Sequence, residues 1–237
     1  MNYKTKQELI EFLKPFVLEN RFELFNRILS ERTRFITVVL EDIYQPQNAS
    51  AVLRTCDCFG IQDVHIIENK NVFELNKDVV LGSAQWLTLY NYNKKEDNSA
   101  HAIENLKKKG YKIVATSPHA DDNLLSDFNI QSGKTAFVFG TEKSGISETV
   151  KEMADEFVKV PMFGFTESFN ISVSAALILH STTEKLRNSK THYGLTENEK
   201  ADLLLQWLRN TIKKVSLLEK KFKELNDKSF DLNHLKL

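Results

Sequence analysis

Residues 135–145, which read TAFVFGTEKSG, pass from a strand into a glycine-bounded loop and indicate the fold class. Thr135–Phe139 is a short, continuous apolar run of the kind found in parallel sheets that are buried on both faces. Gly140 and Gly145 then enclose the acidic residue Glu142. Glycines at these positions let the backbone turn sharply and bring polar groups near a ligand, although a tight turn with a solvated glutamate would give the same pattern.

Strand-like runs recur on both sides of this stretch and alternate with helical segments. This alternation predicts an α/β fold with a mostly parallel sheet flanked by helices. The predicted strands are 35–40, 64–67, 86–92, 111–116, 135–139 and 157–160, and the predicted helices are 49–59, 100–109, a short one from 147, and 169–186.

The segments before and after this core have helical periodicity. We therefore expect an N-terminal helical arm (1–34), an α/β core (35–190) and a C-terminal helical arm (191–237). In the C-terminal arm, Thr196 and Glu199 have the spacing of a capping box.

The distribution of glycine places the expected ligand site late in the chain. The loop after the first strand, residues 41–48, contains no glycine, which excludes a dinucleotide-binding fingerprint. Gly133-Lys134-Thr135 resembles the end of a P-loop, but it precedes a strand and lacks the first glycine. Four of the eight glycines, at positions 133, 140, 145 and 164, surround the last two strands. Ligands bind at the carboxyl ends of parallel strands, so the site is expected there.

Two further polar segments accompany the loop that holds Glu142. Asn48 can cap the first core helix, and Arg54 lies nearly two turns later in an otherwise apolar stretch. A helix cap with an arginine in a structural ion pair would also explain this spacing. Residues 160–174, VPMFGFTESFNISVS, leave a strand through Pro and Gly, and Ser168 or Asn170 begins an apolar helix whose start could hold an anion.

Taken together, these three segments closely resemble the three motifs of the SpoU/TrmH family, which belongs to the SPOUT class. Its members are S-adenosylmethionine-dependent RNA ribose 2′-O-methyltransferases, and the resemblance extends from about residue 35 to 188. It implies a deep trefoil knot in the α/β core, binding of the methyl donor in the knot, and a homodimer. By motif position, the active-site residues would be Asn48, Arg54, Glu142, Ser168 and Asn170, and the donor would be held near Thr116, Gly140, Val160 and Phe169.

Within this family, the short chain with helical arms is most similar to the enzymes that methylate the D-loop guanosine of tRNA. The alternatives are the same chemistry on ribosomal RNA and a catalytically inactive RNA-binding relative. Because a guanidinium stays protonated in proteins, we expect Arg54 to orient a phosphate and stabilise the developing alkoxide. Asn48 and Asn170 would position substrate and loop, and Glu142 would anchor Arg54 or a loop amide.

The charge distribution also bears on an RNA partner. The 237 residues carry 32 Lys and Arg against 32 Asp and Glu, a net charge of zero. Residues 209–223, however, hold six basic side chains and one acidic one, a net charge of +5. A solvated helix face would have this pattern, but so would a surface that contacts tRNA phosphates. The predicted RNA-binding residues are Lys213, Lys214, Lys220 and Lys221.

Several kinds of protein are not expected from this composition. No apolar run approaches a membrane span, and the first twenty residues mix Lys and Glu with apolar residues, unlike a signal peptide. The two cysteines, Cys56 and Cys58, form neither a disulfide framework nor a zinc spacing. The six histidines are scattered, so we expect no metal. A cytoplasmic protein is predicted.

Overall fold

The computed structural model describes residues 1–80, 82–117, 123–142 and 144–234, and the chain divides into two compact units. The core unit comprises Arg32–Gly194. The arm unit joins Met1–Glu31 to Leu195–Leu237, so the two helical arms, which lie at opposite ends of the sequence, pack together.

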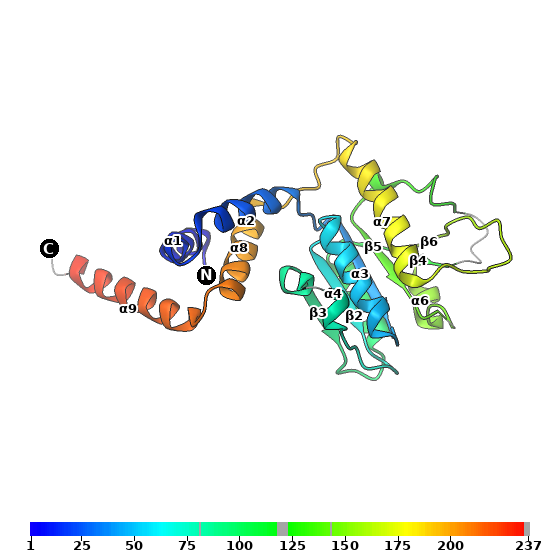
Figure 1. Ribbon diagram of the computed structural model, residues 1–237, viewed down its shortest axis with the longest axis horizontal. Coiled ribbons are helices and arrows are strands. Elements are labelled where there is room, and N and C mark those ends of the chain that lie inside the picture. Colours follow the sequence, from blue (N-terminus) through cyan, green and yellow to red (C-terminus); the bar gives the residue numbers. More distant parts are fainter. Residues whose placement is uncertain (81, 118–122, 143, 235–237) are drawn as a thin grey trace. The chain divides into compact units, whose positions relative to one another are not determined.

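The core unit contains a six-stranded sheet in the order β3-β2-β1-β5-β4-β6, with all strand pairs parallel (Figure 1). The predicted α/β fold with a parallel sheet is therefore confirmed. The last strand ends at Val158 and not at Val160 as predicted, because the backbone of Lys159 hydrogen-bonds to Asn123 and Leu125 instead. The strands are β1 (Ile36–Glu41), β2 (Asp63–Ile67), β3 (Thr88–Tyr92), β4 (Lys112–Thr116), β5 (Thr135–Phe139) and β6 (Glu156–Val158).

Helices cover both faces of this sheet. α3 (Pro46–Cys58) and α7 (Ile171–Arg187) pack against each other over one face (Figure 1). α5 (Asn98–Lys108) and the short α6 (Glu148–Met153) cover the other. α4 (Lys77–Val80) contacts α3.

Side chains of the central strands alternate between the two hydrophobic clusters that result. Val38 and Phe137 belong to the cluster under α3 and α7, whereas Val39 and Val138 belong to the cluster under α5. All four are fully buried. This alternation is the two-residue period of a strand buried on both faces, which explains why the sequence shows continuous apolar runs.

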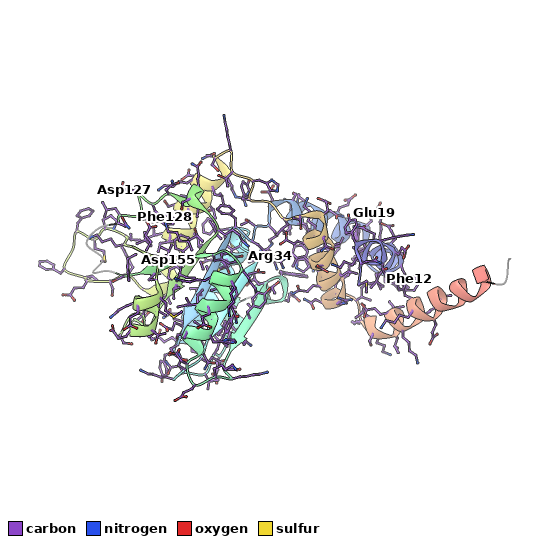
Figure 2. The ribbon with its side chains drawn as sticks, turned by 180° about the vertical axis from the view of Figure 1, so that it is seen from behind. Phe12, Glu19, Arg34, Asp127, Phe128 and Asp155 are labelled. Atoms are coloured by element: carbon purple, nitrogen blue, oxygen red, sulfur yellow. The ribbon has the colours of Figure 1, made fainter. Side chains whose placement is uncertain are left out.

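Polar contacts fix the amino ends of the strands, at the edge of the sheet opposite to the pocket described below. Arg34, labelled in Figure 2, has its Nε 3.1 Å from Asp63 Oδ2, and Tyr111 Oη donates to the Arg34 carbonyl at 2.6 Å. Asp155 accepts from the Ile113 amide at 2.8 Å and from Lys107 Nζ at 2.7 Å. These bonds join the residues just before β1, β4 and β6 to one another or to the neighbouring strands β2 and β4.

The arm unit consists of α1 (Tyr3–Leu13), α2 (Glu19–Glu31), α8 (Glu197–Thr211) and α9 (Val215–His234). Phe25 packs against Trp207 with ring centroids 5.7 Å apart. Thr196 and Glu199 form the predicted capping box at the start of α8. Across the described ranges, no helix has both the length and the apolar character required to cross a bilayer.

Candidate active site

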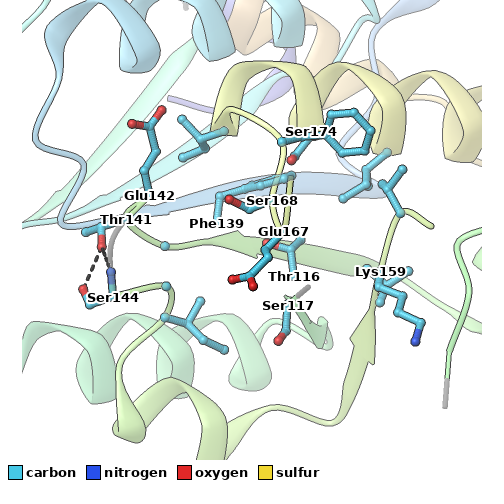
Figure 3. Close-up of a pocket in the computed structure, with 18 of the residues that line it drawn as sticks. Thr116, Ser117, Phe139, Thr141, Glu142, Ser144, Lys159, Glu167, Ser168 and Ser174 are labelled. Atoms are coloured by element: carbon cyan, nitrogen blue, oxygen red, sulfur yellow. Dashed lines mark hydrogen bonds between the residues drawn. The ribbon is translucent and has the colours of Figure 1, made fainter. Parts of the chain in front are cut away.

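A pocket of about 310 Å³ opens where β4, β5 and β6 end, at the edge of the sheet where the sequence predicts the ligand site. The loop after β5, the segment between β6 and α7, and the first turns of α7 complete its wall. Figure 3 shows Thr116, Ser117 and Ser168 within the pocket, with Glu142 at its margin. The pocket is lined by all four predicted donor-binding residues, Thr116, Gly140, Val160 and Phe169, and by Glu142 and Ser168 of the predicted active-site set.

The loop after β5 folds tightly onto the end of its own strand. The Thr141 amide donates to the Gly145 carbonyl at 2.9 Å, and the Gly145 amide donates back to Thr141 at 3.0 Å. Gly145 has a φ of +67°, a conformation that favours glycine. A Cβ atom on Gly140 would lie 2.2 Å from the carbonyl carbon and oxygen of Gly145. Both glycines are therefore required by the shape of this loop.

Three side chains from distant segments converge beside this loop. Glu142 Oε1 accepts hydrogen bonds from Asn48 Nδ2 at 2.8 Å and from Asn170 Nδ2 at 2.7 Å. Asn170 Nδ2 also lies 3.0 Å from Asn48 Oδ1. Three of the predicted active-site residues thus form one hydrogen-bonded network, which links α3, the loop after β5 and the start of α7.

The roles of the two asparagines as helix caps differ. Of the two residues expected to begin this helix, Ser168 and Asn170, it is Asn170 that caps α7, because its Oδ1 accepts from the Ser172 amide at 2.8 Å. The predicted cap at Asn48 is wrong: α3 begins at Pro46, and Asn48 is its third residue. Proline is favoured at the first helical position because its φ is already fixed and its missing N–H is not needed there. The Asn48 side chain is therefore available to bind Glu142.

Arg54 lies on α3 with an exposed side chain and is not part of the pocket wall. The predicted bond from Glu142 to Arg54 or to a loop amide is not found among the described residues, where this carboxylate accepts from the two asparagine side chains. Within the same part of the chain, Arg54 has no hydrogen bond and no ion pair. The structural ion pair considered from the sequence is thus absent there.

Other residues in or beside the pocket were not singled out from the sequence. Ser117, Lys159 and Ile178 line the pocket, and Gln45 Oε1 accepts from Asn48 Nδ2 at 2.9 Å. The rule that ligands bind at strand ends points to Ser117 and Lys159 once the strand order is known. Nothing local in the sequence identifies Ile178 or Gln45.

The described part of the structure gives no support for nucleophilic catalysis by Cys56 or for a metal site. Burial raises the pKa of the Cys56 thiol above its usual range, so this cysteine stays protonated and is not a nucleophile. In the ranges that the structure describes, no three His, Cys, Asp or Glu side chains form a group that could hold a metal ion.

Comparison with known proteins shows which protein family this chain belongs to. The model of the SpoU rRNA Methylase family matches residues 35–180. The tRNA (guanosine(18)-2′-O)-methyltransferase of Borreliella burgdorferi is 43% identical over 210 residues, which cover 89% of this chain and 94% of that protein. The enzyme of the same name from Thermus thermophilus is 30% identical, covering 81% of this chain and 97% of that protein.

Solved structures share the fold. The "A. aeolicus TrmH/SpoU tRNA modifying enzyme" has a TM-score of 0.72 at 24% identity, covering 83% of this chain and 98% of that one. The SpoU methyltransferase AviRb of Streptomyces viridochromogenes, solved with the cofactor AdoMet, has a TM-score of 0.58 at 21% identity, covering 69% of this chain and 62% of that one. The fold is thus that of the SpoU methyltransferases, and in this chain a pocket lies at the carboxyl edge of the parallel sheet. The chain belongs to the SpoU family of RNA methylases.

Proposed function

We propose that this protein transfers a methyl group from S-adenosylmethionine to the ribose 2′-hydroxyl of guanosine 18 in the D-loop of tRNA. The 43% identity to a relative named for this reaction supports the choice of substrate. The observation that carries the proposal is the network of Asn48, Glu142 and Asn170 at the margin of the pocket. It joins the three motif segments in a single site.

The pocket suits the methyl donor in both size and chemistry. A volume of about 310 Å³ falls within the range of small-molecule sites, and the wall combines apolar side chains such as Phe139 and Ile178 with polar ones such as Ser117. Thr116, Gly140, Val160 and Phe169 would hold the donor, which supplies a sulfonium methyl group for transfer. The main-chain groups at strand ends can bind a flat base without side-chain specificity.

The remaining tasks are to orient the ribose and to promote loss of its proton. Arg54 is exposed and uncommitted within the described residues, so its guanidinium can meet an RNA phosphate and stabilise the alkoxide as it forms. Asn48 and Asn170 fix the position of Glu142 and therefore of the loop that carries it. Ser168 would contact the substrate from the pocket wall.

The direct test is to incubate the protein with radiolabelled methyl donor and an unmodified tRNA transcript, and to map the labelled nucleotide by digestion. Label at guanosine 18 is the expected result. A transcript in which that ribose is already 2′-O-methylated is the matched control and should accept no label. Label only in ribosomal RNA would replace the proposed substrate, and tight tRNA binding without label would identify an inactive RNA-binding relative.

The proposal extends to a knotted core, a homodimer, a cytoplasmic location and tRNA contact by the C-terminal arm. Val173 and Leu177, one turn apart on α7, are 44% and 39% exposed, and Phe169, which precedes the N-cap Asn170, is 40% exposed. An apolar stripe of this kind supports burial by a second copy of the chain. Light scattering would measure the dimer, and a monomeric mass at micromolar concentration would contradict it.

The proposed RNA contact involves the corner between α8 and α9 and the first turns of α9. Lys213, Lys214, Lys220 and Lys221 are all exposed. Arg209, which belongs to the same basic stretch, is bound to Glu219 at 2.7 Å. Lys213, Lys214 and Lys221 are therefore better placed than Arg209 to reach phosphates, whereas Lys220 lies 4.0 Å from Glu224 Oε1.

A further inference from the structure

Glu41 is a buried carboxylate at the carboxyl end of β1, outside the family motifs and outside the wall of the pocket. Its side chain and backbone together are only 2% exposed. Burial of a carboxylate is costly unless the charge is compensated by hydrogen bonds or an opposite charge. The partners of Glu41 therefore show what holds it there.

These partners are two serines at the starts of two helices. Oε1 accepts from Ser147 Oγ at 2.7 Å, and Oε2 accepts from the Ser147 amide at 2.8 Å. Ser99 Oγ, at the start of α5, also donates to Oε1. Ser147 therefore gives both of its donors to this single carboxylate.

Ser147 is where the loop of the pocket ends. The segment from Gly140 to Ile146 supplies six residues of the pocket wall, and Ser147 follows at once as the N-cap of α6. The loop is already closed on itself by the paired bonds between Thr141 and Gly145. Glu142 joins this closed loop to α3 and α7, and the bonds from Ser147 to Glu41 join it to the neighbouring strand β1.

The pairing register of β1 and β5 places Glu41 beside the start of this loop. Leu40 of β1 pairs with Phe139 of β5, so Glu41 and Gly140 occupy the next positions on adjacent strands. From there Glu41 reaches across the loop and binds its far end at Ser147. The carboxylate thus ties the far end of the segment that carries Glu142 to the strand that lies beside its start.

We infer that Glu41 is a positioning residue for the donor pocket: it keeps the loop from Gly140 to Ile146 in the geometry that binds the methyl donor, without touching donor or RNA. This inference rests on the proposed function in so far as the pocket holds S-adenosylmethionine. Ser147 connects Glu41 to the loop and so carries this restraint. Ser99 does not, because Ser99 lies on α5 and not on the loop.

The test compares three variants by calorimetric titration with S-adenosylmethionine. Glu41→Gln places an amide N–H opposite one of the serine donors, and Ser147→Ala removes one donor but keeps the backbone N–H. Each should raise the Kd for the donor about tenfold, the change expected when a hydrogen bond to a charged group is removed. Ser147→Thr keeps the hydroxyl, so its Kd for the donor should stay within about twofold of the wild-type value.

Ser99→Ala is the matched control, because it removes a donor from the same carboxylate on the side away from the loop. It should leave the Kd for the donor within about twofold of wild type, even if it lowers the melting temperature. Equal effects of Ser99→Ala and Ser147→Ala on donor binding would overturn the inference, as would an unchanged Kd in Ser147→Ala.

Amide hydrogen exchange in the absence of donor separates this inference from the proposed function. Both Glu41→Gln and Ser147→Ala should accelerate exchange in residues 141–147 more than in β1 or α5. If wild-type protein fails to bind S-adenosylmethionine, the proposed function is wrong, but this exchange pattern still tests the role of Glu41. Unchanged exchange in the loop would overturn that role whatever the pocket binds.

Discussion

Gly140 lies where the backbone of Gly145 folds back onto the end of β5. A methyl group at Gly140 would lie 2.2 Å from main-chain atoms that cannot swing aside as a side chain would. Overpacking of this kind costs about 1–3 kcal/mol. We expect Gly140→Ala to shift the loop and raise the Kd for S-adenosylmethionine by about tenfold, as measured by calorimetric titration.

Gly164 provides the control for this prediction, because a Cβ atom there would meet no other atom within 4 Å. Gly164→Ala should therefore bind the donor as wild type does. An unchanged Kd in Gly140→Ala would mean that the loop has another way to accommodate a side chain.

Arg54 supplies a second prediction at the scale of single residues. Lysine keeps the positive charge but loses the planar, two-pronged donor geometry of guanidinium. In Arg54→Lys, we expect single-turnover methylation at saturating donor to slow at least about tenfold, while the Kd for the donor stays unchanged. Near-wild-type turnover would show that charge alone suffices and that the bidentate role is wrong.

The sequence could predict that Asn48, Glu142, Ser168 and Asn170 lie near one another, but not the bonds between them. Glu142, Ser168 and Asn170 stand at turns or helix starts, where a local pattern marks them. The contact of Asn48 with Glu142 joins residues 94 positions apart and depends on the order of the strands. Glu41 shows the same limitation, since a glutamate at the end of an apolar run would ordinarily be read as solvent-exposed.

At the scale of elements, the edge of the sheet formed by β2 and β3 contains a buried histidine. His65 stacks on Tyr90 with ring centroids 4.7 Å apart, and its Nδ1 lies 3.0 Å from Tyr92 Oη. Burial, with a smaller contribution from the charge of Lys109, lowers the pKa of His65 to about 3. The imidazole therefore stays neutral in the folded protein at pH values where it is protonated in the unfolded chain.

Because of this pKa difference, we expect the folded protein to lose stability as the pH falls. Below pH 6.5 the unfolded chain binds a proton at His65 that the folded protein does not bind until about pH 3. The free energy of unfolding should thus fall, through this group, by about 1.4 kcal/mol for each pH unit below 6.5. Urea unfolding at pH 7, 6 and 5 would measure the slope.

His65→Asn removes the titrating group and should flatten that slope relative to wild type. His192→Asn, at an exposed histidine, is the control and should leave the slope as it is. Equal slopes in His65→Asn and wild type would show that acid lability comes from other groups.

The elements that the sequence predicted best are those with a strong local cause. β1 and β5 are continuous apolar runs because both faces are covered, and α8 begins at a capping box. The start of α3 was missed because Asn48 is a favourable cap, whereas Pro46 is the first helical residue. The end of β6 was misplaced because Lys159 pairs with a distant segment.

For the whole protein, the basic stretch 209–223 leads to a prediction about RNA binding. Changing Lys213, Lys214, Lys220 and Lys221 to Gln should weaken tRNA binding and leave donor binding unchanged. For each lysine that no longer neutralises a phosphate, the plot of log K against log salt concentration should become less steep by about 0.7–0.9. Filter binding at several salt concentrations would measure both effects.

Four exposed lysines of the core unit form the matched control: Lys70, Lys94, Lys95 and Lys108. Their change to Gln removes the same charge from the protein and should have a smaller effect on the salt slope. Equal slopes in the two variants would mean that net charge, and not the position of the arm lysines, determines binding.

The composition of the arm unit has a consequence for protein synthesis. α1 packs against α8, so the buried side chains of Leu9 and Leu13 acquire their covering only after α8 has been made. At roughly 5–20 residues per second, the ribosome needs about 10–40 s to translate the intervening chain. The core unit is translated during this interval and is complete at Gly194, just before α8 begins at Glu197, so the apolar faces of the first two helices stay open to chaperones while the core is being made. Premature termination before α8 would leave those faces open permanently.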